Sequence, residues 1–443
     1  MLNINKTILV NTVLFNETEF LIGFMCLSFL SSSIRNTDIV EFKNEKCIDL
    51  DQYEKLCKIF VEKIQIKLRD CSCVIFYSTI STVSRTIEIS RKIKSSNKDI
   101  KIICVGPNIG NIPRSRLSFA DEYIDLIISI NEINSLKKYL NELNIEVKWP
   151  EQQKIFSPEL LKTNWNKFSI KYHNNSLPLI ASIGCLYNCS FCDYREYFGS
   201  SYRCFNPGDI IKLIKYNIQQ VSIRNFKFID SSLTSYPYLK DLCTSIINDE
   251  LNIRWSCFGR VNEIDEELCF LMARSGCEKV ILGIESGSNQ MLKNCNKSGV
   301  NTEKIKEAVS ILKKYKIDAE GSFIIGIPNE TEEETMRTIE FASSLKLKRY
   351  YWHTYFPKLH DILKFNINHV YQKLIDLEMI YSTDIPNNLW DELVKRHKEF
   401  IYHRHALVNI EDKEILNGLP WSEVFTIPVN KYIGNLNDVQ KLR

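Results

Sequence analysis

The sequence predicts an α/β protein with a Rossmann-like, doubly wound parallel sheet, then a partial (β/α)6 TIM-type barrel, then a short helical C-terminal region. Short apolar runs alternate with helix-length stretches in two blocks, and this alternation stops before the last ~90 residues. With 443 residues, 44% of them hydrophobic, the chain is long enough for two hydrophobic cores. The boundaries we expect are 1–145 for the first domain, 146–178 for a linker, 179–355 for the barrel and 356–443 for the helical region.

The composition is that of an ordinary globular protein and excludes several classes of protein. Aromatic residues at 11% and charged residues at 25% exclude a disordered tail, a collagen-like fibre and a coiled coil. The 57 basic and 54 acidic residues leave a net charge of +3, which gives no reason to expect a nucleic-acid partner. The most apolar stretch, Phe20–Leu30, is too short to span a bilayer, and the N-terminus lacks the features of a secretory signal. We therefore expect no membrane partner and a cytoplasmic location.

The first domain is predicted from apolar runs that alternate with helical stretches. The strands we expect are Thr7–Val10, Asp38–Phe42, Cys73–Tyr77, Ile100–Val105 and Leu126–Ser129. The helices between them include Leu50–Lys67, Val83–Lys94 and Glu132–Leu143. The fourth strand ends in a tight turn that begins at Gly106, and open α/β sheets bind ligands at the carboxyl ends of their strands. This turn is therefore a candidate ligand site.

The barrel is predicted from a second, longer alternation. Residues 146–178 interrupt the pattern with Trp149-Pro150 and Leu177-Pro178, which indicates a linker or a strap over the surface. The strands we expect are Leu179–Ile183, Phe226–Asp230, Ile253–Cys257, Lys279–Gly283, Glu320–Ile325 and Tyr350–Tyr355. The helices are Pro207–Gln219, Tyr238–Asn248, Glu266–Arg274, Thr302–Tyr315 and Thr331–Leu345, followed by amphipathic stretches at Val370–Leu377 and Trp390–His403. The active site of such a barrel lies at the carboxyl ends of the strands.

Cysteine carries the strongest chemical signal. The chain holds 15 cysteines, none after Cys295, and three of them, Cys185, Cys189 and Cys192, lie within eight positions in the loop GCLYNCSFC. This loop directly follows the first predicted barrel strand. Three thiolates on one loop suit a [4Fe–4S] cluster with one iron left open, whereas an electron carrier or a zinc ribbon uses four cysteines. A zinc site completed by a distant histidine and three incidental cysteines are the other interpretations of this spacing.

The loop resembles the signature of the radical S-adenosylmethionine (SAM) superfamily, which is Cx3Cx2C with an aromatic residue, here Phe191, before the last cysteine. Later segments are similar to the strand ends of that family's barrel. They are FIDSS at 228–232, RWSCFGRV at 254–261, GIESGS at 283–288 and GSFIIGIPNET at 321–331. With the first domain included, the chain resembles the radical enzymes that carry an N-terminal cobalamin-binding domain.

The resemblance implies a role for each of these segments. The open iron would chelate the amino and carboxylate groups of SAM, and an electron from the cluster would then release methionine and a 5′-deoxyadenosyl radical. Arg260 would pair with the methionine carboxylate, and Glu285 would accept hydrogen bonds from the ribose hydroxyls. The other expected cofactor contacts, near the methionine amino group, the ribose and the adenine, are Phe191, Asp230, Ser231, Ser286, Gly326 and Ile327.

The N-terminal domain departs from those cobalamin domains that supply a histidine to cobalt. They use an Asp-x-His-x-x-Gly loop, and this chain has no histidine before His173. The Gly-Gly-x-His turn of related enzymes appears here as Gly106-Pro107-Asn108. Two interpretations stay open: cobalamin binds without a protein ligand, against backbone near Ser78 and Gly106, or the domain binds no cobalamin.

The leading hypothesis is a cobalamin-dependent methyltransferase that acts on an unactivated carbon of a natural-product or peptide substrate. The alternative is a cobalamin-independent radical epimerase, cyclase or rearrangement enzyme with a degenerate cobalamin domain. An iron–sulfur sensor is disfavoured by the intact SAM-binding segments. A methylthiotransferase is disfavoured because the last ~90 residues have a helical pattern where that class carries a small RNA-binding β-barrel, and because the net charge of +3 indicates no RNA partner. The partners that the resemblance implies are a small-molecule or peptide substrate and an external electron donor such as flavodoxin or ferredoxin.

Overall fold

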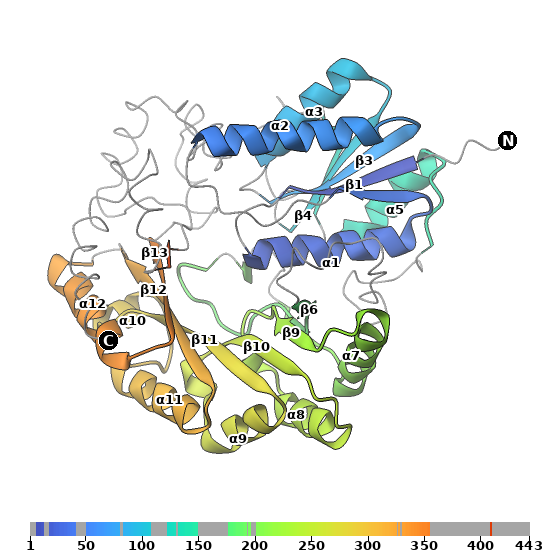
Figure 1. Cartoon of the computed structure of the whole chain (residues 1–443). Helices are drawn as coiled ribbons and strands as arrows, with labels where there is room; N and C mark the ends of the chain where they lie inside the picture. The colour runs from blue at the N-terminus through green and yellow to red at the C-terminus, as the bar shows by residue number, and fades with distance from the viewer. Residues whose placement is uncertain are drawn as a thin grey trace.

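The computed structural model contains two parallel sheets, one in each half of the chain (Figure 1). It describes residues 6–12, 17–40, 50–79, 83–107, 122–129, 132–148, 176–192, 194–195, 201–325, 327, 330–354 and 408–409. Helix α1 (Glu17–Ser33) lies between the two sheets, and buried residues of both halves belong to one contiguous hydrophobic cluster.

The N-terminal half is a doubly wound parallel sheet, as predicted. Its strands are β1 (Lys6–Asn11), β2 (Thr37–Val40), β3 (Cys71–Tyr77), β4 (Lys101–Gly106) and β5 (Leu126–Ser129). They pair in the order β2-β1-β3-β4-β5, and all of the pairs are parallel. Helices α2 (Leu50–Lys67) and α3 (Val83–Ser96) cover the face away from the second sheet, while α5 (Ile133–Glu142) follows β5 (Figure 1).

This strand order moves the expected ligand position. The chain leaves β1 toward one edge for β2 and toward the other for β3, so the topological switch point lies between β1 and β3. The sequence predicts that a ligand binds at the carboxyl ends of Cys73–Tyr77 and Ile100–Val105. These are the neighbouring strands β3 and β4. Only the β3 side of that prediction coincides with the switch point.

The second half is an open barrel of parallel strands with helices on its outer face (Figure 1). In spatial order its strands are β6 (Leu177–Leu179), β9 (Asn225–Phe228), β10 (Arg254–Gly259), β11 (Cys277–Glu285), β12 (Asp318–Ile325) and β13 (Arg349–Thr354). The helices that cover it are α7 (Pro207–Val221), α8 (Leu239–Asn248), α9 (Glu266–Arg274), α11 (Thr302–Lys314) and α12 (Glu332–Leu345). The α/β class and the parallel arrangement are therefore as predicted.

Side-chain caps fix where several barrel helices begin. Asp265 accepts a hydrogen bond from the backbone N–H of Leu268, and Asn301 accepts one from Lys304. Thr331 forms a capping box with Glu334. These caps fix the residue at which each loop after a strand ends and the next helix begins.

Two predicted elements differ from the structure. The single strand expected at Leu179–Ile183 is divided into β6 and β7 (Ser182–Ile183), and β7 pairs antiparallel with β8 (Arg203–Cys204). The C-terminal region, expected to be helical, supplies β14 (Val408–Asn409), which pairs antiparallel with β13. The predicted helices at 370–377 and 390–403 and most of the 146–178 linker lie outside the described residues.

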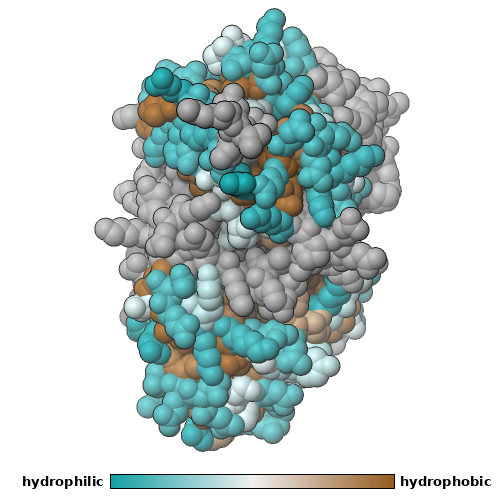
Figure 2. Space-filling view, turned by 90° about the vertical axis from the view of Figure 1, so that its right-hand side faces the viewer, coloured by the Kyte–Doolittle hydropathy of each residue, from teal (hydrophilic) through white to brown (hydrophobic). Residues whose placement is uncertain are grey.

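The described surface on the face shown in Figure 2 is mainly hydrophilic, and hydrophobic residues gather there in patches between hydrophilic ones. No helix in the described part of the chain is both long and apolar enough to cross a membrane.

Candidate functional site

The three cysteines of the signature lie on a loop that begins directly after β7. Cys189 is buried, and Cys185 and Cys192 are half-buried. The loop starts at Gly184, which has a φ of +92° and where an added Cβ would collide with the Ser201 carbonyl oxygen, so both features require glycine. The path of the loop is therefore defined before the first cysteine.

A second segment supports the cysteine loop from the side of β11. It follows the short helix α10 (Asn289–Asn294). The backbone N–H of Ser190 donates to the Cys295 carbonyl (3.0 Å), and the Asn296 side chain donates to the Asn188 carbonyl (2.7 Å). These bonds hold the loop on both sides of its second cysteine, Cys189. No pattern in the sequence predicts this segment.

Arg260 brings a buried positive charge to the cysteine loop. It follows β10 and is 5% exposed, and its Nη1 lies 3.7 Å from the Sγ of Cys189. Its guanidinium carbon lies 3.6 Å from the centre of the Tyr187 ring, a cation–π contact within the loop itself. Burial, followed by the hydrogen bond that the Tyr187 hydroxyl donates to Glu263, raises the pKa of Tyr187 to about 12.

A buried ion pair lies at the end of the next strand. The Nζ of Lys297 is 2.5 Å from Oε1 of Glu285, and both side chains are 6% exposed. Glu285 has a φ of +68°, a left-handed conformation that is costly for a residue with a Cβ. Gly283 makes room for the pair, since a Cβ there would lie 2.6 Å from Glu285 Oε1. Lys297 also lies 5.9 Å from the ring centre of Phe191, so the pair borders the cysteine loop.

Asp230 shapes the approach to the loop. Its carboxylate accepts hydrogen bonds from the backbone N–H groups of Ala181 and Ser182 and from the Ser182 hydroxyl. Burial raises the pKa of Asp230 to about 6, although these hydrogen bonds act in the opposite direction. The carboxylate is thus directed at Ala181 and Ser182, where the chain passes from β6 to β7.

The remaining predicted residues divide between packing and support. Phe191 packs against a buried apolar cluster that includes Ile327. The Ser231 hydroxyl donates to the Gly184 carbonyl (2.9 Å), and the buried Ser286 hydroxyl lies 2.9 Å from that of Thr338 on α12. Gly326 lies outside the described residues.

The donor chemistry of the site fits an iron–sulfur cluster. Three thiols come from one loop, and a buried cation stands beside the central one. Among the described residues no three His, Cys, Asp or Glu side chains converge as a single metal ion requires. The ligands of a cubane each bind a different iron, so they need not converge on one point.

Comparison with known proteins agrees with this chemistry. Residues 179–342 match the model of the radical SAM superfamily. Residues 179–342 therefore form a radical SAM domain. This chain is an enzyme with that domain, and the matched residues run from β6 to α12, the same strands and helices that position the cysteine loop, Arg260 and Glu285.

Two curated relatives are methyltransferases. An uncharacterized methyltransferase of Pyrococcus horikoshii is 26% identical over 344 residues, 72% of this chain and 73% of the relative. Bacteriochlorophyllide d C-12(1)-methyltransferase of Chlorobaculum tepidum is 28% identical over 182 residues, and the match covers 40% of each protein. The first match is much longer than the radical SAM domain, so it extends beyond that domain.

Solved radical SAM enzymes share the fold. TsrM of Kitasatospora setae, a radical SAM methyltransferase, has a TM-score of 0.59 at 15% identity, covering 79% of this chain and 75% of that one. The cobalamin-dependent enzyme OxsB has a TM-score of 0.56 at 16% identity, covering 97% of this chain and 61% of that one. The fold of TsrM and OxsB is thus shared by most of this chain.

Buried hydroxyl groups gather at the switch point of the N-terminal sheet. Thr12 follows β1 and donates to the Tyr77 carbonyl (2.8 Å), and Thr86 on α3 donates to the Ser78 hydroxyl (3.0 Å). Gly106 is buried at the end of β4, and the neighbouring Val105 carbonyl accepts from the Ser78 N–H (2.9 Å). The N-terminal domain therefore presents small polar side chains, without histidine, at the ends of β1 and β3.

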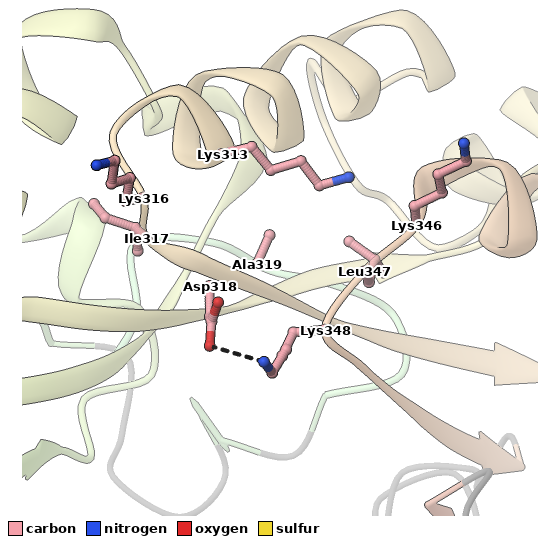
Figure 3. A pocket seen from close by; sticks show the side chains of 8 residues that line it. All are labelled: Lys313, Lys316, Ile317, Asp318, Ala319, Lys346, Leu347 and Lys348. Carbon is pink, nitrogen blue, oxygen red and sulfur yellow. Dashed lines mark ion pairs between the residues drawn. The ribbon is translucent and has the colours of Figure 1, made fainter. Parts of the chain in front are cut away.

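A cavity of about 530 Å³ lies at the other end of the barrel strands and is separate from this site (Figure 3). It is bordered by the first residues of β12 and by four lysines. Lys313 donates to the Leu345 carbonyl (2.8 Å), Lys348 lies 3.9 Å from Asp318, and Lys316 and Lys346 point away from one another (Figure 3). Lys313 lies in the last turn of α11, where a lysine compensates the helix dipole.

Proposed function

We propose that this chain is a cobalamin-dependent radical SAM methyltransferase. It holds a [4Fe–4S] cluster on Cys185, Cys189 and Cys192, cleaves SAM reductively, and methylates an unactivated carbon of a small-molecule or peptide substrate. The observation that carries the proposal is the three-cysteine loop at the carboxyl end of the first barrel strand, with Arg260 beside Cys189. When bound, the cluster supplies the electron for SAM cleavage and cobalamin supplies a methyl carrier.

The residues at the strand ends provide the surroundings of SAM. Oε2 of Glu285 accepts no hydrogen bond from the described residues, which leaves it for a ribose hydroxyl. Phe191 and Ile327 form an apolar wall next to the cysteine loop. Gly326, in the same segment as Ile327, is proposed to contact the adenine through its backbone. In this proposal Asp230 holds the backbone at Ser182, which leads into the cysteine loop, and does not contact the methionine amino group.

The N-terminal domain is proposed to bind cobalamin without a protein ligand on cobalt. By the switch-point rule we expect the corrin at the ends of β1 and β3, near Thr12 and Ser78, with Gly106 at the margin. Small hydroxyl side chains there permit close approach of a large planar ligand. The fold shared with TsrM, solved with cobalamin and a [4Fe–4S] cluster bound, and with cobalamin-dependent OxsB supports this assignment.

A cobalamin-independent radical enzyme is the second candidate function. The observation that favours it is the absence of histidine before His173, which removes the usual protein ligand. In that case hydrogen abstraction from the substrate is followed by epimerisation, cyclisation or rearrangement. For either function the electron comes from an external donor of the flavodoxin or ferredoxin class.

Anaerobic reconstitution of the full chain tests the proposal. We expect about four irons per chain, a sulfide-to-iron charge-transfer absorbance, and release of 5′-deoxyadenosine from SAM with dithionite. The triple variant Cys185→Ala, Cys189→Ala, Cys192→Ala should lose all three, while Cys204→Ala, a half-buried thiol on β8, should keep them. Retention of the absorbance by the triple variant would overturn the cluster assignment.

Washing the protein after incubation with hydroxocobalamin separates the two candidate functions. Stoichiometric retention, with no nitrogen superhyperfine splitting in the cob(II)alamin spectrum, supports the methyltransferase. Release of all cobalamin by a protein that still forms 5′-deoxyadenosine supports the cobalamin-independent enzyme instead.

A further inference from the structure

Both terminal nitrogens of Arg260 contact groups of the protein. Nη1 faces Cys189 Sγ at 3.7 Å, and Nη2 donates to the Ser298 carbonyl at 3.2 Å. Nε is fully enclosed and has no hydrogen-bond partner among the described residues. A carboxylate binds arginine through two adjacent N–H groups, and here Nη1 and Nη2 each use one of their two N–H groups for a protein contact while Nε is enclosed. Arg260 therefore directs one edge of its guanidinium at the cysteine loop.

A clamp between the loop and the β10 turn holds the guanidinium in this place. The Tyr187 ring, between the first two cysteines, covers one guanidinium face at 3.6 Å. The Tyr187 hydroxyl donates to Glu263, which lies three residues after Arg260 in the same turn. The Arg260 backbone N–H donates to the Thr234 hydroxyl (2.8 Å), which fixes the start of that turn. Tyr187 and Glu263 are thus positioning residues for the charge.

A fixed cation at a cluster thiolate changes the energy of adding an electron. Reduction adds one negative charge to the cluster, and a neighbouring positive charge stabilises the product more than the reactant. At 5% exposure Arg260 is little screened by solvent.

From this geometry, and on the basis of the proposed function, we propose that Arg260 raises the reduction potential of the cluster through Cys189, with Tyr187 and Glu263 holding it in place. The electron comes from an external one-electron donor, a reduced flavin or iron–sulfur protein, and enters the cluster with no proton transferred. The role differs from the SAM-carboxylate contact that the sequence suggests.

An EPR-monitored redox titration of the reconstituted full chain without SAM tests this proposal. Arg260→Gln removes the charge, and we expect at least a tenfold smaller equilibrium constant for reduction, which is 59 mV for one electron. Arg254→Gln is the matched control, because it removes the same charge from the exposed start of β10. Arg254 is six residues away, about 20 Å along the strand and beyond the screening length. Its midpoint should stay unchanged.

Two further variants test the clamp. Tyr187→Leu removes the aromatic face and should lower the midpoint by a smaller amount, whereas Tyr187→Phe keeps the face and should lower it less. Leu186→Ala, at an exposed position of the same loop, should have no effect. If Arg260→Gln takes up no cluster, Tyr187→Leu provides the measurement.

An unchanged midpoint in Arg260→Gln, or in Tyr187→Leu where it serves instead, overturns the proposal. A loss of SAM affinity with that unchanged midpoint would assign Arg260 to the SAM carboxylate. A wild-type chain that forms no cluster would contradict the proposed function, which is a distinguishable result.

Discussion

Replacing Lys297 with methionine should destabilise the barrel far more than losing one surface charge. The variant leaves the Glu285 carboxylate 5% exposed and without the ammonium group that now lies 2.5 Å away. Removing one partner of a buried ion pair costs about 3–5 kcal/mol of unfolding free energy, because the remaining charge stays desolvated. Methionine has a similar length, so little of this cost comes from a cavity.

Urea unfolding of the cluster-free full chain measures the effect through a double-mutant cycle. The cycle uses Lys297→Met, Glu285→Gln and the double variant. Because Glu285→Gln removes the stranded charge, the double variant should regain about 1–3 kcal/mol relative to the sum of the single changes. Lys306→Met is the control, since it breaks an exposed pair with Glu303 of 3.0 Å and should cost less than about 1 kcal/mol.

Two results would refute this reasoning. One is an equal loss of unfolding free energy in Lys297→Met and Lys306→Met. It would mean that a buried Glu285 loses no more stability without its lysine than an exposed glutamate does. The other is strict additivity of the two single changes, which would mean that the two groups do not interact in the folded protein.

Two other predictions concern the approach to the cysteine loop. Burial raises the pKa of Asp230 to about 6, above ~3.9 in an unfolded chain, so the folded state retains a proton that the unfolded state releases. The contribution of Asp230 to the unfolding free energy is then full below about pH 4 and falls by about 3 kcal/mol as the pH rises through 6. Asp230→Asn should abolish this part of the pH dependence of urea unfolding. Parallel pH profiles for the wild-type chain and the variant would contradict the prediction. Gly184→Ala should reduce iron uptake severalfold, because its Cβ would collide with the Ser201 carbonyl. Gly208→Ala is the control: the atom nearest to its Cβ is 3.2 Å away, and this variant should bind iron normally. Equal iron uptake by the two variants would contradict the prediction.

The sequence predicts elements well where their boundaries carry local signals. Helix α9 matches its prediction to the residue because Asp265 provides a cap directly before it. Strand β5 matches because its four residues form a short apolar run between polar segments. Such signals are contained in a few neighbouring residues and do not depend on the rest of the fold.

Helix α1 escapes prediction for the opposite reason. It lies between the two sheets, and its residues Cys26, Leu27, Phe29 and Leu30 are buried on several sides. A helix without a polar face gives no 3.6-residue periodicity, so the sequence shows only an apolar run. The division of β6 from β7 depends likewise on a distant residue. Asp230, about fifty residues away, accepts hydrogen bonds from the N–H groups of Ala181 and Ser182.

The site shows the same difference between local and distant information. The cysteines are recognised from eight consecutive residues, whereas Lys297, Tyr187 and Glu263 acquire their roles only when three separate strand ends meet. A lysine twelve residues after a glutamate, across a short helix, has no periodic relation to it. The ligands of the proposed cluster are therefore identifiable from the sequence, whereas the residues that orient and charge its surroundings are not.

Of the two buried cations beside the cysteine loop, only one has a negatively charged partner, and this difference links the fold to the proposed chemistry. Lys297 has a carboxylate partner in Glu285, but Arg260, equally buried, has only a thiol, a carbonyl oxygen and an aromatic ring among its described contacts. A buried cation without an anion is costly. Three thiolates on an adjacent loop would supply the missing negative charge. The protein without its cluster therefore retains an uncompensated charge at Arg260, and cluster binding relieves the same charge that we propose to raise the reduction potential.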